Sequence, residues 1–460
     1  MYRPDRGFVP RPPRAILFFL LVLTLAVQPV HVCATGALNS SPDSFSARDE
    51  AFLEDLERRS FRYFWEQAGS RTGLVLDRTR TDGSPADENH RDVASIAATG
   101  FGLTALCIAA ERNWVKHDEA RERVRTTLRF FADRASHEHG WFYHWLDVNT
   151  GERKWKSEVS SIDTALLLAG ALTARHYFHD DAEIVSLVNA IYERIDFPWM
   201  LNGHPALLSM GWRPETGFIK ARWDDYSEHP ILYLMAIGSP THPITPAAWY
   251  AWKRNWNRYD GYHYLGKTPL FTYQYSHAWI DFRGRRETAS EHIDYFANSV
   301  KATLAHRRFC MDLAKEFAGY GPNIWGISAS DSIKGYVAWG GPPRDKAIDG
   351  TVVPYAAAGS LMFVPRLAIA ALKTMRARYP RTYGKYGFAD AFNPNTRWIN
   401  RDVIGIDLGI TLLGAENARS GNVWRWFMKN PEIPKALEMV GLRKYGQQRR
   451  GIRRRLLKAA

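Results

Sequence analysis

Apolar residues recur at helical spacing through most of the chain. After Ser46 and Asp49, which have the spacing of a capping box, the apolar positions between 52 and 64 fall on one side of a helix. The same periodicity predicts helices over residues 95–112, 119–132, 162–178, 182–195, 228–237, 246–256, 290–317, 354–375, 404–417 and 431–439. Long alternating runs are scarce, so the pattern predicts a mainly helical protein.

One segment departs from the helical pattern. Residues 140–159, GWFYHWLDVNTGERKWKSEV, predict a β-hairpin whose turn is Asn149, Thr150 and Gly151. About a dozen helices joined by long, aromatic and glycine-rich loops predict an all-α toroid in which inner and outer helices alternate. The loops at one rim of such a toroid build its cleft, with the small hairpin at the rim. We therefore expect the functional residues on loops.

The first 34 residues have the features of a targeting segment. Four arginines within residues 1–14 precede an apolar run over residues 15–27, and Val32, Cys33 and Ala34 offer small side chains at a cleavage point. The apolar run is too short to span a bilayer comfortably. We predict a signal peptide over residues 1–34, a linker over 35–45, one domain over 46–442 and a basic tail over 443–460. The location that this predicts is periplasmic or secreted.

Basic residues are concentrated at the two ends of the chain. The formal net charge is +13, but eight Lys and Arg residues without an acid lie between Arg443 and Lys458, so the body is nearly neutral. We therefore expect no nucleic-acid partner. Clustered basic residues attract polyanions, so weak contact of the tail with an anionic membrane surface is one interpretation, and a solvated terminus is the simpler one. Without a self-association signature, we expect a monomer.

Cysteine and histidine spacing gives no support for a metal site. After the signal segment only Cys107 and Cys310 remain, and each lies in a helical pattern. We predict buried free thiols, with a single disulfide as the alternative in an oxidising compartment. His137, Glu138 and His139 do not have a recognised ligand spacing, so the prediction is that no metal or other cofactor is bound.

Tryptophan usage favours a carbohydrate ligand. All 17 tryptophans follow the signal segment. A pyranose has an apolar C–H face and a polar hydroxyl edge, so its site needs flat aromatic rings beside polar groups. Core packing explains many of these tryptophans equally well. Those that lie beside polar residues in predicted loops or in the hairpin are Trp141, Trp145, Trp155, Trp212, Trp223, Trp279, Trp325 and Trp339.

Glu228 is the leading candidate for a catalytic acid. Hydrolysis of a glycoside needs two carboxyl groups, one protonated and one ionised. Glu228 follows Ser227, a candidate N-cap, and precedes Pro230, which predicts a place in the first turn of a helix. Glu is also favoured there because it complements the helix dipole, which would lower its pKa. Burial against Trp223 and Tyr226 would have to raise it.

Four other acids compete for the second role. Glu158 ends the predicted hairpin, and Asp163 follows five residues later as a capping partner of Ser160 or as a catalytic group. Asp402 and Asp407 flank the apolar segment Val-Ile-Gly-Ile that leads into a predicted helix. An acid placed there is either a cap or a functional group, because unpaired burial of a charge is costly. Spacing alone leaves all four open.

Taken together, the ordered motifs resemble the glucoamylase-type family that contains glycoside hydrolase family 144, the bacterial β-1,2-glucanases. The resemblance covers nearly all of the chain from Phe52 to about Leu442. The strings that carry it are GLVLDRTR, VASIAATGFGLTAL, SEVSSIDTALLLAG, WDDYSEHPILYLMAIGSPTHPI, QYSHAWIDFRG, DYFANSVKATLAHRRFC, YGPNIWGISASD, DGTVVPYAAAGSLMFVP, YGKYGFADAFN, DVIGIDLG and VWRWFMKNPEI.

This resemblance implies an (α/α)6 toroid that hydrolyses β-1,2-glucan with inversion, releases sophorose or short β-1,2-glucooligosaccharides and needs no metal. Glu228 matches the family's acid, and Asp407 is the best match for the base, with Asp402 as its neighbour and alternative. Glu158, in the same motif as Asp163, matches another cleft acid. The substrate-binding residues that it implies are Trp223, Tyr226, Gln274, His277, Trp279, Asp281, Arg283 and Asp331.

Three departures from the family pattern bear on specificity. Arg366 replaces the acid of an FxPE motif, Leu408 replaces the amide of IDQG, and Ser332 with Ile333 stands where the family has Gly-Pro. Lost hydrogen-bond partners for sugar hydroxyls would alter the preferred linkage or chain length. A non-catalytic glucan-binding protein is therefore one alternative hypothesis. A β-1,2-glucan transglycosylase is the other, because a related domain fold occurs within cyclic β-1,2-glucan synthases.

Overall fold

Helices are the predominant regular structure in the part of the chain that the structure describes, and the predicted helical class is confirmed. The computed structural model describes residues 45–445. The predicted signal peptide, the linker up to residue 44 and most of the basic tail lie outside the described residues. Within residues 45–445, no helix has both the length and the apolar character that crossing a bilayer requires.

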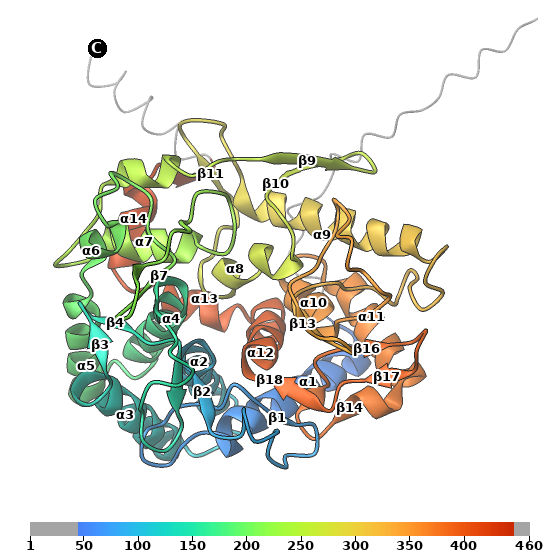
Figure 1. Cartoon of the computed structure of the whole chain (residues 1–460), viewed down its shortest axis with the longest axis horizontal. Coiled ribbons are helices and arrows are strands. Elements are labelled where there is room, and N and C mark those ends of the chain that lie inside the picture. Colours follow the sequence, from blue (N-terminus) through green and yellow to red (C-terminus); the bar gives the residue numbers. More distant parts are fainter. Residues whose placement is uncertain (1–44, 446–460) are drawn as a thin grey trace, which may run out of the picture. The chain divides into compact units, whose positions relative to one another are not determined.

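Six helices are apolar on nearly all sides and are almost completely buried. A helix of this kind has no face for water and must be surrounded by others. Helix α2 packs against both α4 and α12, and in Figure 1 these helices lie near the centre of the described unit. The six are α2 (Ile96–Glu111), α4 (Ser161–Tyr177), α7 (Pro230–Gly238), α8 (Tyr275–Trp279), α10 (Pro354–Ala358) and α12 (Gly405–Arg419).

Six further helices have one buried face and one exposed face, and each precedes or follows one of the buried helices in the chain. Their apolar stripe faces inward and their charged stripe faces water, as the sequence periodicity predicts. They are α1 (Ala47–Glu66), α3 (His117–Asp133), α5 (Ala182–Arg194), α9 (Tyr295–Leu313), α11 (Pro365–Arg378) and α14 (Glu432–Met439). Two short helices, α6 (Phe197–Leu201) and α13 (Asn422–Phe427), complete the set.

The described strands are two to four residues long and lie in the loops between helices. All their pairings are antiparallel. The pairs are β1 (Arg78–Arg80) with β18 (Asp402–Ile404), β2 (Val93–Ser95) with β5 (Trp145–Asp147), β3 (His137–Glu138) with β4 (Trp141–Phe142), β6 (Val159–Ser160) with β7 (Gly211–Arg213) and then β8 (Gly217–Phe218), β9 (Trp256–Tyr259) with β10 (Tyr262–Leu265), β11 (Arg285–Glu287) with β19 (Leu442–Lys444), β12 (Ser330–Ser332) with β13 (Gly335–Val337), β14 (Tyr383–Gly384) with β15 (Gly387–Phe388), and β16 (Phe392–Asn393) with β17 (Trp398–Ile399).

Both predicted capping boxes are confirmed. Ser46 caps α1 and accepts the N–H of Asp49, and Ser160 caps α4 and accepts the N–H of Asp163. The predicted burial of free thiols is also confirmed, since Cys107 and Cys310 are both buried and unbridged. The two caps could be predicted because each depends on a serine and an aspartate that lie three residues apart in the sequence.

Two helix predictions were wrong. Pro365 lacks the N–H that would continue a helix, so residues 354–375 divide into α10, a 3-10 turn and α11. Residues 246–256 form only a 3-10 turn, Pro246–Tyr250. The predicted hairpin is present, since antiparallel bridges join its arms at Tyr143–Val159 and Leu146–Arg153, and β5 also pairs with β2.

Glycines allow α2 and α4 to pack closely. A Cβ on Gly170 would lie 2.0 Å from the carbonyl oxygen of Gly100, and a Cβ on Gly100 would lie 2.2 Å from the carbonyl oxygen of Leu166. Neither backbone oxygen can turn away as a flexible side chain can. The two helices therefore need glycine at the crossing, although glycine weakens each helix by about 1 kcal/mol relative to alanine.

We expect Gly170→Ala to lower the free energy of unfolding by about 1–3 kcal/mol, because overpacking at the α2–α4 crossing outweighs the gain in helix propensity. Urea unfolding followed by circular dichroism measures the change. Gly321→Ala is the matched control, since a Cβ there meets nothing within 4 Å, and its effect should stay within about 0.5 kcal/mol. Equal losses in both variants would contradict the close-packing argument.

Candidate active site

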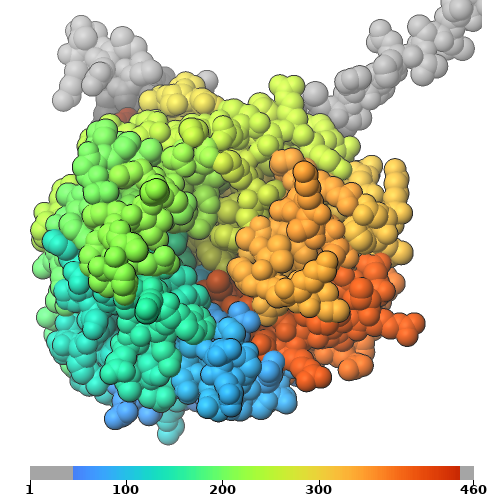
Figure 2. All heavy atoms as spheres, in the orientation of Figure 1, coloured from blue at the N-terminus to red at the C-terminus, as the bar shows by residue number. Residues whose placement is uncertain are grey.

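The amino-terminal ends of all six buried helices meet at one cavity of about 320 Å³. Figure 2 shows this face of the molecule hollowed where the green, blue and orange segments meet. Carboxyl groups, one arginine, two histidines and several aromatic side chains line the cavity. Its polar and aromatic lining comprises Asp77, Arg78, His90, His144, Trp145, Trp155, Asp163, Glu228, Phe271, Tyr275, Tyr336, Tyr355 and Asp407.

Glu228 lines the cavity from the segment that leads into α7. The helix begins at Pro230 with His229 as its cap, so the prediction that Ser227 caps it and that Glu228 lies in its first turn was wrong. The Ser227 hydroxyl instead donates to Glu228 Oε2, and Ser276 Oγ donates to the main-chain oxygen of Glu228 at 2.5 Å. Burial raises the pKa of Glu228 despite the Ser227 bond, with a further rise from the Asp163 charge.

Asp407 lines the same cavity from the first turn of α12 and is buried. Burial raises its pKa well above the ordinary value, and the neighbouring charge of Asp390 raises it further. Asp390 itself lies in the loop between β15 and β16 and is 3% exposed. Asp390 and Asp407 line one small void together. The cavity therefore has a carboxyl pair on the α12 side and a single carboxyl, Glu228, on the α7 side.

A chain of alternating charges runs toward the cavity from the α4 side. Arg213 donates to Glu158 Oε2 at 2.9 Å, and Glu158 Oε1 lies 3.1 Å from His144 Nδ1. His144 Nε2 in turn lies 3.5 Å from Asp163 Oδ1, and both His144 and Asp163 line the cavity. The bond with His144 lowers the pKa of Glu158 to about 2. Although burial opposes its charge, Asp163 and then Glu158 raise the pKa of His144.

Aromatic rings occupy the outer part of the cavity. Trp155 is 47% exposed and Tyr336 is 57% exposed, yet both line the cavity. The indole of Trp145 stacks on His144 with ring centroids 3.9 Å apart. Deeper in the cavity, burial raises the pKa of Tyr275, as do the charges of Asp407 and then Glu228. Open rings around a charged interior have the composition expected of a sugar site.

The eight predicted substrate-binding residues are all described, and none of them lines this cavity. Several are structural hydrogen-bond partners between helices. Trp223 Nε1 donates to Ser161 of α4, Trp279 Nε1 donates to Thr104 of α2, and Gln274 Nε2 donates to the main-chain oxygen of Ala356 in α10. Tyr226, His277, Asp281, Arg283 and Asp331 complete the set of eight.

These five residues also have other partners. Tyr226 belongs to a buried aromatic cluster, and buried His277 accepts or donates at Ser299 Oγ, 3.0 Å away. Arg283 binds Asp281 and stacks on Trp424, which follows the carboxyl end of α12. Since Asp407 begins this 15-residue helix, Arg283 lies roughly 20 Å from it.

Asp331 and Asp402 support the cavity from behind. Asp331 accepts from Arg78 and from Asn400, each at 2.9 Å. Asp402 Oδ1 accepts from Arg80 at 2.6 Å. Of the two acids that the sequence could not separate, Asp407 therefore faces the cavity and Asp402 binds an arginine on β1.

Sequence reasoning missed several charged residues at the site, Asp77, Arg78 and His90 among them, and Asp390 and His144 show why. Asp390 lies in the motif YGKYGFADAFN, which was used only for the resemblance, and no local spacing connects it to Asp407. His144 lies inside the predicted hairpin between Tyr143 and Trp145. Its two aromatic neighbours gave no indication that it belongs to a charged site. Asp390 and His144 both reach the site through contacts between distant segments.

The three departures lie around the cavity, outside its lining. Arg366 is exposed near the start of α11. Leu408 is buried directly behind Asp407 and lines a void of about 10 Å³ with Asp390. Ser332 and Ile333 form the turn of the β12–β13 hairpin that carries Tyr336.

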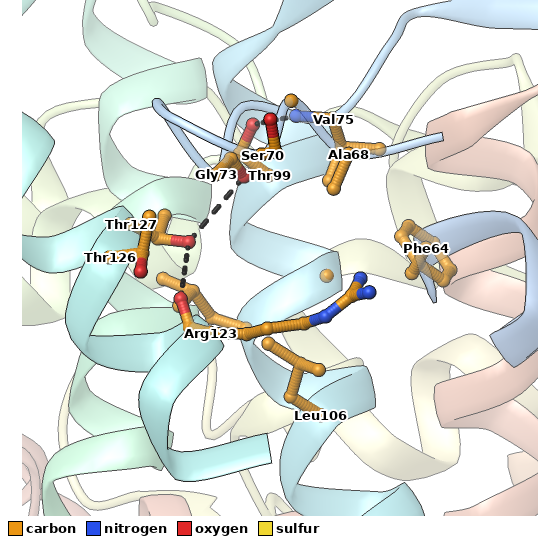
Figure 3. A pocket seen from close by; sticks show the side chains of 13 residues that line it. Phe64, Ala68, Ser70, Gly73, Val75, Thr99, Leu106, Arg123, Thr126 and Thr127 are labelled. Atoms are coloured by element: carbon orange, nitrogen blue, oxygen red, sulfur yellow. Dashed lines mark hydrogen bonds between the residues drawn. The ribbon is translucent and has the colours of Figure 1, made fainter. Parts of the chain in front are cut away.

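Another cavity, of about 180 Å³, lies between α1, α2 and α3 (Figure 3). Arg123 reaches into it from α3, and Thr99 and Thr127 lie beside it (Figure 3). Among the described residues that line it, none is Asp or Glu. It therefore lacks the carboxyl groups that glycoside hydrolysis needs.

Comparison with known proteins agrees with this arrangement. The family model described as "putative glucoamylase" matches residues 220–431, which include Glu228, Asp390 and Asp407. The structure of an endo-β-1,2-glucanase from Chitinophaga pinensis, in complex with sophorotriose and glucose, superposes with a TM-score of 0.80 at 28% identity over 87% of this chain and 99% of that chain. The resemblance to the glucoamylase-type family is confirmed.

A second glucoamylase-type structure, from Bacteroides uniformis, also gives a TM-score of 0.80 at 28% identity, over 87% of this chain and 99% of that chain. An exo-β-1,2-glucooligosaccharide sophorohydrolase (non-reducing end) from Parabacteroides distasonis is 26% identical over 450 residues, which cover 88% of this chain and 60% of that protein. The chain thus spans less than two thirds of that relative. Two of these three relatives are named for action on β-1,2-linked glucans, the substrate class predicted from the sequence.

We expect Glu158→Gln to destabilise the protein at neutral pH by on the order of 3 kcal/mol, and much less at pH 2. The folded pKa of Glu158 is lowered to about 2 from 4.5, so its contribution is complete above pH 4.5 and is lost as pH falls toward 2. Urea unfolding of both proteins across this range measures the difference. Glu215→Gln removes an exposed carboxylate that binds Arg153 and should cost less. A pH-independent difference for Glu158→Gln would contradict the assignment.

Proposed function

We propose that this chain is a glycoside hydrolase that cleaves β-1,2-glucan and releases sophorose or short β-1,2-glucooligosaccharides. The observation that carries the proposal is that one cavity holds Glu228, with a raised pKa, and a second carboxyl group, Asp407, on another helix. Glycoside hydrolysis needs this combination of a proton donor and a carboxyl group that activates water. The similarity to β-1,2-glucanases supports the choice of linkage.

The reaction follows from the protonation states of the two carboxyl groups. Glu228, kept protonated by burial, donates its proton to the glycosidic oxygen as the bond to the anomeric carbon breaks. Water attacks the anomeric carbon and loses a proton to Asp407. Glu228 comes from the segment that leads into α7 and Asp407 from the first turn of α12. Inversion requires a gap between the two carboxyl groups that is wide enough for the attacking water.

The aromatic rings and the buried charged groups would contact different parts of a bound sugar. Trp155, Tyr336 and Trp145 offer apolar faces for pyranose rings at the cavity mouth. Deeper inside, Arg78 and His144 are held in place by carboxyl partners and lie beside the space for the sugar hydroxyl groups.

The alternation of six buried and six half-buried helices supports the finer fold proposal, an (α/α)6 toroid. Its inner helices would be α2, α4, α7, α8, α10 and α12, with their amino-terminal ends at the cleft. The targeting features of residues 1–34 support export to the periplasm or the medium. The three departures leave Glu228 and Asp407 in place, so catalysis is favoured over binding alone. The products of the reaction would distinguish transglycosylation from hydrolysis.

We expect Glu228→Gln to lower kcat on linear β-1,2-glucan by about 10²- to 10⁴-fold while substrate binding is retained, because the amide cannot donate the acid's proton. Product chromatography and calorimetric titration with β-1,2-glucooligosaccharides measure the two effects. Asp224→Asn is the matched control, since Asp224 lies in the same segment but binds Lys253 at the surface. If wild type released no products from β-1,2-glucan yet bound it, the binding alternative would replace this proposal.

The raised pKa of Glu228 predicts where activity is lost on the alkaline side. An acid catalyst must be protonated, so kcat/KM should fall as pH rises through a pKa above the 4.5 of an ordinary Glu. A pH series on β-1,2-glucan, with polarimetry to follow the anomer formed first, tests both the acid and the inversion. An alkaline limb at or below pH 4.5 would exclude Glu228 as the acid.

A further inference from the structure

Asp390 is held behind Asp407 by main-chain and side-chain contacts. Its N–H donates to the main-chain oxygen of Asp402 at 3.0 Å, which ties its loop to β18, and β18 leads directly into α12. Its Oδ2 accepts from the N–H of Asp331 at 2.8 Å and from Asn400 Nδ2 at 3.0 Å. The position of this carboxyl group is therefore fixed relative to the first turn of α12.

The other oxygen of Asp390 is in a different situation. Oδ1 is buried and has no hydrogen-bond partner among the described residues, and Asp390 lines a small void together with Asp407. A buried carboxylate oxygen without a donor is costly. Two ionised carboxylates repel each other, whereas a proton on Asp407 would supply the donor that Asp390 Oδ1 lacks.

The charges around the pair favour a single shared proton. Arg78 is the nearby cation, but its N–H groups bind Asp77 and Asp331. Arg80 binds Asp402, and the remaining polar neighbours of Asp407 are the phenol groups of Tyr275, Tyr336 and Tyr355. A second negative charge on the pair would have no cation to itself, whereas one charge is stabilised by the two N–H groups on Asp390 Oδ2.

Leu408 contributes to this isolation. Its buried side chain lines a void of about 10 Å³ with Asp390, Asp407 and Thr411. That volume is at the lower limit for one water molecule. A leucine offers no donor to Asp390 Oδ1, so that oxygen stays without a partner on this side.

We propose that Asp390 and Asp407 share one proton, and that Asp390 is the positioning residue that finally accepts the proton released by the attacking water. This inference rests on the proposed hydrolase function. In the resting pair, Asp407 carries the proton and donates it to Asp390 Oδ1. When water attacks, its proton passes to the free oxygen of Asp407, and the original proton of Asp407 moves to Asp390.

The step balances without another reactant. The oxygen of water forms a bond to the anomeric carbon, the glycosidic C–O bond breaks, and the leaving oxygen takes the proton of Glu228. The pair ends neutral and Glu228 ends ionised. Exchange of one proton with solvent then restores both groups. Asp390 acts throughout by way of Asp407 and does not touch the sugar.

Double-mutant kinetics test whether Asp390 acts through Asp407. We expect Asp390→Asn to lower kcat by about 10²-fold or more with KM little changed, and the double variant with Asp407→Asn to be no worse than Asp407→Asn alone. In Asp390→Asn the amide oxygen can still accept from Asp331 and Asn400. The pKa of Asp407 should fall once its charged neighbour is removed, so the acid limb of kcat/KM should move to lower pH. Multiplicative losses, or an unmoved acid limb, would overturn the proposal.

Infrared difference spectroscopy tests the shared proton without any substrate. At neutral pH, wild type should show a protonated-carboxyl band that both Asp390→Asn and Asp407→Asn lack. Leu408→Gln, which brings an amide donor to Asp390, should weaken the same band. An unchanged band in Asp390→Asn would overturn the proposal even if the enzyme is active. If wild type does not cleave β-1,2-glucan, the proposed function fails while the band still decides on the shared proton.

Asp181→Asn is the matched control for both measurements. Asp181 is a buried aspartate that caps α5 and binds Arg125, on the outer helices and outside the cavity lining. Asparagine caps a helix as well as aspartate does, so kinetics, acid limb and infrared band should stay as in wild type. If this control reproduced the Asp390→Asn changes, they would reflect a general loss of structure, and the positioning role would be overturned.

Discussion

The main physical constraint on this structure is the partial burial of several carboxyl groups at the point where the six buried helices begin. Glu228, Asp163 and Asp407 come from segments far apart in the sequence and share one cavity. A buried charge is costly unless it is paired or neutralised. Each acid has a different environment: Asp163 lies beside the His144 imidazole, burial raises the pKa of Glu228, and Asp407 lines a small void with a second carboxyl group, Asp390. These different solutions let chemically similar side chains take different roles.

Arginines behind the cavity make this arrangement possible. Arg78 and Arg80, on β1, bind acids that come from β12 and β18, and so fix the loop that precedes α12. Arg213 does the same for Glu158 on the α4 side. Their carboxylate partners are thereby neutralised, whereas Glu228 and Asp407, unlike Asp77 in the same lining, form no ion pair with an arginine among the described residues. The support for the site is electrostatic, and the aromatic residues at the mouth supply surface for the ligand.

Sequence reasoning succeeded where the signal is local and failed where it depends on packing. Capping located the start of α1, periodicity located α4 to within one residue, and Glu228, the leading candidate from the sequence, lines the cavity. The sequence alone could not show whether Trp223, Trp279 and Gln274 contact a substrate. A segment that mixes polar and aromatic residues is equally compatible with a buried contact between helices and with a sugar site. Asp390 could not be predicted as a site residue either, because only the fold brings it close to Asp407.

The most direct test of the account is a crystal structure of the Glu228→Gln variant with a bound β-1,2-glucooligosaccharide. The account predicts that a glycosidic oxygen lies within hydrogen-bond distance of the side chain at position 228, and that a water molecule lies between Asp407 and the anomeric carbon. It also predicts Trp155 or Tyr336 against a sugar ring. An oligosaccharide bound away from the cavity, or an anomeric carbon in direct contact with Asp407 and no intervening water, would contradict it.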